Sequence, residues 1–144
     1  MGRRFLSDVP GIHPRNCFFP EIAADLGAKS FPLFLVEDDM EVKEVFLIPS
    51  KDIIGGGING DFAKIEVKRK RTGVADVVLA VIDFVGGIVA FFNVAKVMPI
   101  DTTYTQLLAG DVVYMEKTNT GGTGLLIPDS IISVGFEYNN PPTS

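Results

Sequence analysis

The sequence predicts a mainly β protein, built as a compact β-sandwich or small β-barrel that follows an extended N-terminal arm. About seven or eight short segments rich in Val, Ile and Phe recur from Phe31 onward, with turn residues between them. A long amphipathic helical pattern is missing from the chain. At 144 residues the chain suffices for one domain with a sizeable core, so we expect a β domain over 31–138.

Composition excludes several classes of function. The net charge of −5 disfavours sequence-independent binding to nucleic acid, because that affinity comes from Lys and Arg side chains. Cys17 is the only cysteine, which rules out an intramolecular disulfide and a thiolate-rich zinc site. The apolar stretch from Ala75 to Met98 contains Asp76, Asp83 and a Gly-Gly pair, and its Val, Ile and Phe residues favour strands. We therefore expect neither nucleic acid nor a membrane as a partner.

The first thirty residues are interpreted as an arm. Met1 to Ser30 holds three prolines and one short helical signal, in which Pro20 suits the first helical position and Gly27 the stop. No apolar signal-peptide region follows the basic start. An arm of this kind buries too little side chain to offset its ordering entropy unless it lies on a partner. Deleting it is therefore expected to leave the domain folded and to weaken attachment to that partner.

The next segments read as strands separated by turns. Phe31 to Val36 and Val42 to Ile48 are predicted strands, with the acidic turn Glu37-Asp38-Asp39 between them and Pro49 after the second. Asp61 to Lys70 alternates most clearly. Its apolar positions Ala63, Ile65 and Val67 are expected on the buried face, and Lys64, Glu66 and Lys68 on the solvent face.

Two hairpins are predicted in the second half of the chain. Val77 to Phe84 and Ile88 to Val94 flank a Gly-Gly turn, and their continuous apolar character suggests central strands. Val112 to Glu116 and Gly124 to Ile127 flank a tip at Lys117 to Thr123. Ile131 to Tyr138 is expected to close the domain, and the polar residues 139–144 form a tail.

Candidate reactive sites lack the arrangement that chemistry requires. The loop Gly55 to Asp61 runs into a strand rather than a helix and has no P-loop lysine, so we interpret it as a connection. His13 and Cys17 are separated by Pro14, and no orienting third group accompanies them. The acidic cluster Glu37-Asp38-Asp39 with Glu41 lacks EF-hand spacing. We expect no catalytic residue, no cofactor and no bound metal, and hence no enzyme.

Residues for binding another protein are easier to nominate. The basic run Lys68-Arg69-Lys70-Arg71 fits docking on an acidic partner, although such runs are also ordinary solvated surface. Adjacent phenylalanines in a strand point to opposite faces, so one ring of each pair needs a second cover from this chain or from a neighbour. The candidate interface consists of Arg3, Arg4, Phe5, Phe18, Phe19, Lys68, Arg69, Lys70, Arg71, Phe91 and Phe92.

Several C-terminal motifs carry a resemblance to a known family. Ala109-Gly110-Asp111 precedes a predicted strand, and Gly122-Thr123-Gly124-Leu125 followed by Pro128 leads into the last one. Together with the segment Val45 to Ser50 and the glycine-rich loop after it, this resembles the capsid decoration (cement) proteins of tailed phages. The resemblance covers about two-thirds of the chain, and the motifs that carry it are turn residues between strands.

The resemblance implies a β-tulip-like or jelly-roll-like domain that forms homotrimers and binds the major capsid protein on the exterior of the virion. In that role an arm would lie across neighbouring capsid subunits. The basic run Lys68 to Arg71 and the longer Met1 to Ser30 arm are not part of the sequence pattern that resembles the family. The alternative function is a small β-barrel that binds an apolar ligand or a sugar, which the apolar strands and glycine-rich tips would also fit.

Overall fold

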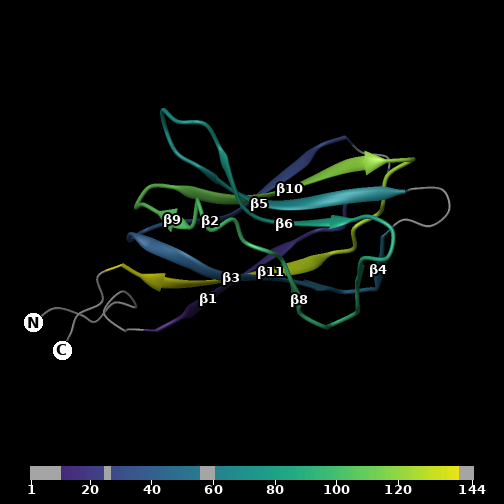
Figure 1. Cartoon of the computed structure of the whole chain (residues 1–144), viewed down its shortest axis with the longest axis horizontal. Coiled ribbons are helices and arrows are strands. Elements are labelled where there is room, and N and C mark those ends of the chain that lie inside the picture. The colour runs from purple at the N-terminus through teal and green to yellow at the C-terminus, as the bar shows by residue number, and fades with distance from the viewer. Residues whose placement is uncertain (1–10, 25–26, 56–60, 140–144) are drawn as a thin grey trace, which may run out of the picture.

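Antiparallel β-sheets make up the fold (Figure 1). The computed structural model describes residues 11–24, 27–55 and 61–139, and these residues form strands and turns with no helix. The two larger sheets curl toward each other as a half-barrel, and Figure 1 shows them as two layers. The predicted mainly β sandwich or barrel is therefore confirmed.

One layer, called sheet A, joins strands from both ends of the chain. Its order is β1 (His13–Phe19), β11 (Ser130–Tyr138), β3 (Met40–Pro49) and β8 (Lys96–Val97), and β9 (Gln106–Leu107) pairs with the other end of β3. The register places Phe18 opposite Ile131, and Ile131 opposite Ile48. Phe46, which lies two residues before Ile48 on the same side of β3, is opposite Val97.

The other layer, called sheet B, has the order β2 (Lys29–Leu35), β10 (Val112–Gly121), β5 (Phe62–Lys70) and β6 (Val77–Phe84). A two-stranded ribbon of β4 (Ile53–Ile54) and β7 (Val89–Ala90) completes the fold. The alternation predicted for β5 is confirmed on its inner side, where Ala63, Ile65 and Val67 are fully buried. Glu66 on the outer side is also largely buried, because neighbouring strands flank β5 on both edges.

The core lies between the two sheets and is filled by apolar side chains. Every second residue of each long strand points inward, as the two-residue period of a strand requires. Sheet A contributes Val45, Leu47, Ile132, Val134 and Phe136, and sheet B contributes Ile65, Val67, Leu79, Val113 and Met115.

The N-terminal segment departs from the prediction. His13 to Phe19 is strand β1, paired with β11 over its full length, so residues 11–24 belong to the domain rather than to a separate arm. The helix predicted from Pro20 to Gly27 is wrong, because the described part of that segment contains no helix. Ile22 instead exchanges two backbone hydrogen bonds with Ile127, at 2.8 and 3.0 Å, and its side chain is 1% exposed. A short helix is marginal by itself, and burying Phe19 and Ile22 favours the extended path.

The first predicted hairpin is also wrong in its pairing. Gly86 and Gly87 do form a turn, but β7 pairs with β4 and not with β6, which forms an edge of sheet B. Gly55 after β4 explains the choice, since it donates a 2.8 Å backbone hydrogen bond to Ile88 and lies so close that a Cβ would be 2.6 Å from the Val85 carbonyl oxygen. The strand predicted over Ile88 to Val94 shrinks to two residues, and a turn replaces the rest.

The second predicted hairpin likewise forms only in part. β10 continues to Gly121, well beyond the predicted end at Glu116, because β5 pairs with it as far as Gly121. Gly124 to Ile127 contains no strand apart from the bridge between Ile127 and Ile22. The final strand occurs where it was predicted, as β11. None of the described residues forms a helix that is long and apolar enough to cross a membrane.

Candidate protein-binding surface

The outer side of sheet A carries a row of apolar side chains that no layer of the described chain covers. Phe18, Ile131 and Ile48 stand side by side on β1, β11 and β3, and Phe46 and Val97 form the next row on β3 and β8. Phe18 is 64% exposed, Val97 59% and Ile131 38%. These five residues, together with the turn Phe91–Val94, are called the sheet A face.

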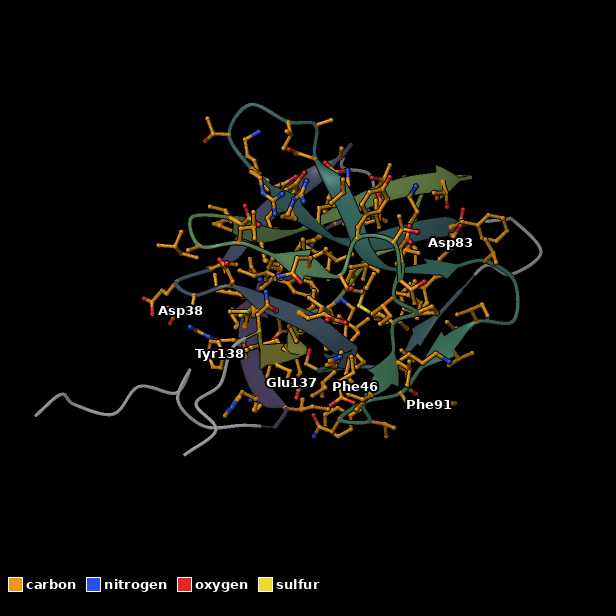
Figure 2. The ribbon with its side chains drawn as sticks, turned by 60° about the vertical axis from the view of Figure 1, so that its left-hand side comes forward. Asp38, Phe46, Asp83, Phe91, Glu137 and Tyr138 are labelled. Carbon is orange, nitrogen blue, oxygen red and sulfur yellow. The ribbon has the colours of Figure 1, made fainter. Side chains whose placement is uncertain are left out.

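The turn Phe91–Val94 extends this surface beyond the end of β3. Its backbone is fixed, because the Phe92 N–H donates to Asp52 Oδ1 at 2.7 Å and the Asn93 N–H donates to the Pro49 carbonyl at 2.9 Å. Asn93 adopts a positive φ of 55°, which a tight turn needs and asparagine tolerates. Phe91 and Phe92 are each 56% exposed. Figure 2 shows Phe91 and Phe46 on the same side of the molecule.

A shallow hollow of about 150 Å³ lies within the sheet A face. Its lining is Phe18, Ile48, Ser50, Asn93, Asp129, Ser130 and Ile131. The Ser50 hydroxyl donates to Asp129 Oδ1 at 2.6 Å, and the Ser130 hydroxyl donates to the Pro128 carbonyl at 2.7 Å. Both hydroxyls and Asp129 Oδ1 already have partners, so a second surface placed on the hollow would not leave these groups unsatisfied.

The exposed apolar area of this face is large for a small protein. Each aromatic ring buries about 150–250 Å² when it is fully covered. The exposed fractions of Phe18, Phe91, Phe92, Val94, Val97 and Ile131 then sum to roughly 500–600 Å². Patches of about 300–600 Å² are the largest that monomers commonly show, and they often have a function. This face is therefore suited to contact another protein.

The outer side of sheet B carries paired charged and polar side chains over its middle, beside the exposed Leu35 at the end of β2. Lys68 donates to Glu116 at 2.8 Å, and the Ser30 hydroxyl donates to the same carboxylate at 3.2 Å. The Lys68 hydrogen bond, against a smaller opposing effect of burial, holds the pKa of Glu116 below its usual value. Tyr114 donates to Asp76 at 2.5 Å, and burial together with this bond raises the pKa of the phenol. Charged and polar side chains satisfy each other here and meet water.

The basic run from Lys68 to Arg71 is not a free cationic patch. Lys68 pairs with Glu116, and Lys70 lies 3.7 Å from Asp76 with its side chain 70% exposed. Arg69 points into the sandwich and is 8% exposed. Arg71 is held by Asp111, as described next. Glu116 and Asp111 lie 48 and 40 residues away in the chain, so the sequence could not reveal these two partners.

Asp111 and Arg71 form a bidentate ion pair at the start of β10. Arg71 Nε and Nη2 donate to the two carboxylate oxygens at 2.8 and 2.7 Å, and the Leu108 N–H donates to Asp111 Oδ2 at 2.8 Å. Asp111 is 1% exposed. Burial alone would raise the pKa of this carboxyl, but the Arg71 and Leu108 hydrogen bonds hold it below its usual value. The ion pair connects the end of β5 to the start of β10.

The remaining nominated residues are distributed differently. Phe18 and Phe19 do point to opposite sides of β1, but Phe19 is fully buried in the core, so its ring is not available to a partner. Phe91 and Phe92 are both exposed, because they lie in a turn and not in a strand. Arg3, Arg4 and Phe5 lie outside the described residues, and their interface role stays a prediction.

Among the sites that were set aside as reactive centres, residues 56–60 of the loop Gly55 to Asp61 lie outside the described residues, so the interpretation of that loop stays a prediction. His13 contacts the rings of Phe136 and Tyr138, and Cys17 lies four residues along the same extended strand, about 13 Å away by strand geometry. Asp39 Oδ1 accepts a hydrogen bond from the Ala109 N–H at 2.9 Å. In the part of the chain that the structure describes, no three His, Cys, Asp or Glu side chains converge as metal ligands would.

Sequence reasoning missed five apolar members of the sheet A face: Phe46, Ile48, Val94, Val97 and Ile131. The signal was present in β3 and β11, where apolar residues occupy outward as well as inward positions. Such strands resemble central strands covered on both sides. Only the topology shows that a covering layer is missing on this side.

Comparisons with known proteins do not identify a family. No protein-family model matches the chain, and no curated protein or solved structure matches it either.

Proposed function

We propose that this chain is a structural, non-enzymatic protein that attaches to the exterior of a tailed-phage capsid, where it stabilises the lattice of the major capsid protein. The observation that carries the proposal is the contrast between the two outer faces. Sheet B turns paired charges to water, whereas the sheet A face exposes a continuous apolar surface. A surface of that kind is typical of a protein that works by contact.

The positions of the resembling motifs support the same proposal. The turn Ala109-Gly110-Asp111 immediately precedes β10, and Pro128 closely precedes β11. The family pattern expects each motif directly before a strand. The N-terminal residues Arg3, Arg4 and Phe5 are proposed to add contacts to neighbouring capsid subunits.

Shell stabilisation follows from binding linkage. A protein that binds only the assembled lattice lowers the free energy of that state and leaves isolated subunits unaffected. The interface must then join at least two capsid subunits, with an area in the usual range of about 1,200–2,000 Å² in total.

The alternative of a ligand-binding barrel has less support. Apolar side chains fill the space between the sheets, and the hollow in the sheet A face is open and shallow. A barrel that carries a ligand would instead enclose it among convergent polar groups.

A sedimentation assay tests the proposal. The purified protein is mixed with mature shells from a panel of tailed phages that lack their own decoration protein, and bound protein is measured in the pelleted shells. We expect saturable binding to at least one shell and a higher temperature of shell disruption. Val97→Ser should reduce binding, whereas the matched control Val74→Ser, at a similarly exposed valine outside the sheet A face, should not. Absence of binding across the panel would contradict the proposal.

A further inference from the structure

We infer that the sheet A face is covered by a second copy of this chain, with the Phe91–Phe92 turn of each copy inserted in the hollow of the other. This inference gives the surface that carries the proposed function a different occupant, so a second copy and a capsid shell would compete for the sheet A face. The knob is the pair of exposed rings in the turn, and the hollow is the depression lined by Phe18, Ile48 and Ile131.

The dimensions of knob and hollow agree. The hollow has a volume of about 150 Å³ and a largely apolar floor. An enclosed apolar cavity of about 150 Å³ accepts a benzene ring, and this open hollow offers one side of a site of that size. One phenylalanine ring from outside therefore fits, and the rings of the same molecule do not occupy it, since both remain 56% exposed.

The knob is displayed on a fixed backbone. Hydrogen bonds to Asp52 and to the Pro49 carbonyl hold the turn at the end of β3, where Asn93 itself forms part of the wall of the hollow. Knob and hollow are thus neighbours on one face. Two copies related by a two-fold rotation near this point would each offer a knob to the other's hollow, which is the reciprocal pairing of an isologous interface.

The chemistry of the face favours a copy of the same chain over a transient partner. Interfaces between identical subunits are more apolar than transient ones, and their polar groups must be satisfied when they are buried. Ser50, Asp52 and Asp129 are already hydrogen-bonded within the chain. The exposed apolar area of roughly 500–600 Å² approaches the ~800 Å² that each partner contributes to a standard interface.

Both signs of charge occur near the turn. Lys51 and Asp52 precede β4, and Asp52 accepts the hydrogen bond from the Phe92 N–H. A rim with both signs can pair with its own symmetry copy, which limits the repulsion between two chains of net charge −5.

Sedimentation velocity over a range of protein concentrations tests the inference. The unaltered chain should self-associate reversibly. A knob variant, Phe91→Ser with Phe92→Ser, and a hollow variant, Ile131→Lys, should each weaken association by more than about tenfold, as loss of a central interface contact does. Val74→Ser is the control and should behave as the unaltered chain. Circular dichroism confirms that each variant keeps the fold.

A mixing experiment separates this geometry from general stickiness. The knob variant retains its hollow and the hollow variant retains its knob, so a mixture can form one intact contact. We expect the mixture to associate more tightly than either variant alone. A mixture no tighter than its components would contradict the reciprocal arrangement, as would a monomeric unaltered chain or association that both variants leave unchanged.

The outcomes also distinguish this inference from the proposed function. A monomer that binds shells through Phe91, Phe92 and Ile131 would overturn self-association and leave the capsid role standing. A chain that self-associates through these residues but binds no shell would do the reverse.

Discussion

The ion pair of Arg71 and Asp111 is the contact whose loss should be most costly among the described charged residues. Arg71→Ala would leave a carboxylate that is 1% exposed with the Leu108 N–H as its remaining hydrogen-bond donor among the described residues. Breaking a buried pair costs about 3–5 kcal/mol, and we expect about 3 kcal/mol because Arg71 is partly exposed. Urea unfolding would measure it. Arg71→Lys is the control, since it keeps the charge and loses only the bidentate geometry; a loss as large as that of alanine would contradict the role of charge.

The same pair predicts how stability depends on pH. The folded pKa of Asp111 lies below its usual value of 3.8, so its contribution is present above pH 3.8 and is lost as the pH falls through the folded pKa. The difference in unfolding free energy between the unaltered chain and Arg71→Ala should therefore be constant near neutral pH and shrink below about pH 4. A difference that grows in acid would contradict this assignment.

Gly124 is a second residue with a strict local requirement. Its φ is +84°, and a Cβ at this position would overlap the Ala24 carbonyl oxygen and the Asn119 side chain. Asn119 Nδ2 donates to that carbonyl at 2.6 Å, and the fully buried Lys117 donates to the Ala23 carbonyl at 3.1 Å. Gly124→Ala should destabilise the protein by more than about 1 kcal/mol, measured by thermal unfolding. Gly73→Ala, at another positive φ but with open space around it, should cost less.

At the scale of elements, the structure revises what removal of the N-terminus should do. Deleting residues 2–10, which precede the described residues, should leave the domain folded. Deleting residues 2–24 removes β1 together with Phe19 and Ile22 from the core. A single large-to-small core substitution costs about 2–5 kcal/mol, against a typical stability of about 5–15 kcal/mol. The longer deletion should therefore be unfolded by circular dichroism, and a folded product would contradict the integration of β1.

The strands that could be predicted from sequence differ from the strand that was missed in the side chains at their inward positions. β3, β5 and β11 were predicted because their inward positions are apolar at every second residue. β1 was missed because it lies at an edge, where inward positions hold His13, Arg15 and Cys17. The turn at Gly86 and Gly87 was located correctly, but the partner of each strand depends on contacts far apart in the chain, which local patterns do not encode. For the same reason Phe18 could be nominated from sequence and its neighbours on β3 and β11 could not.

At the scale of the whole molecule, the two outer faces differ in chemistry. Sheet B presents paired charges to water, and sheet A offers an apolar surface in which the Ser50 hydroxyl and Asp129 are already hydrogen-bonded. Salt should therefore affect association through an apolar face and association through a charged face differently. Self-association through the sheet A face should persist or strengthen in sulfate, because apolar burial does not depend on charge screening. Association that falls steeply with sodium chloride would instead indicate an electrostatic interface.

Hydroxyl-radical footprinting tests the central claim that another protein covers the sheet A face. Side-chain oxidation is measured by mass spectrometry in dilute protein, in concentrated protein and in protein mixed with binding shells. The account predicts protection of Phe18, Phe91, Phe92 and Ile131 on concentration or on shells, while Tyr104 and Tyr114 keep their reactivity. Equal oxidation of all six residues under the three conditions would contradict it.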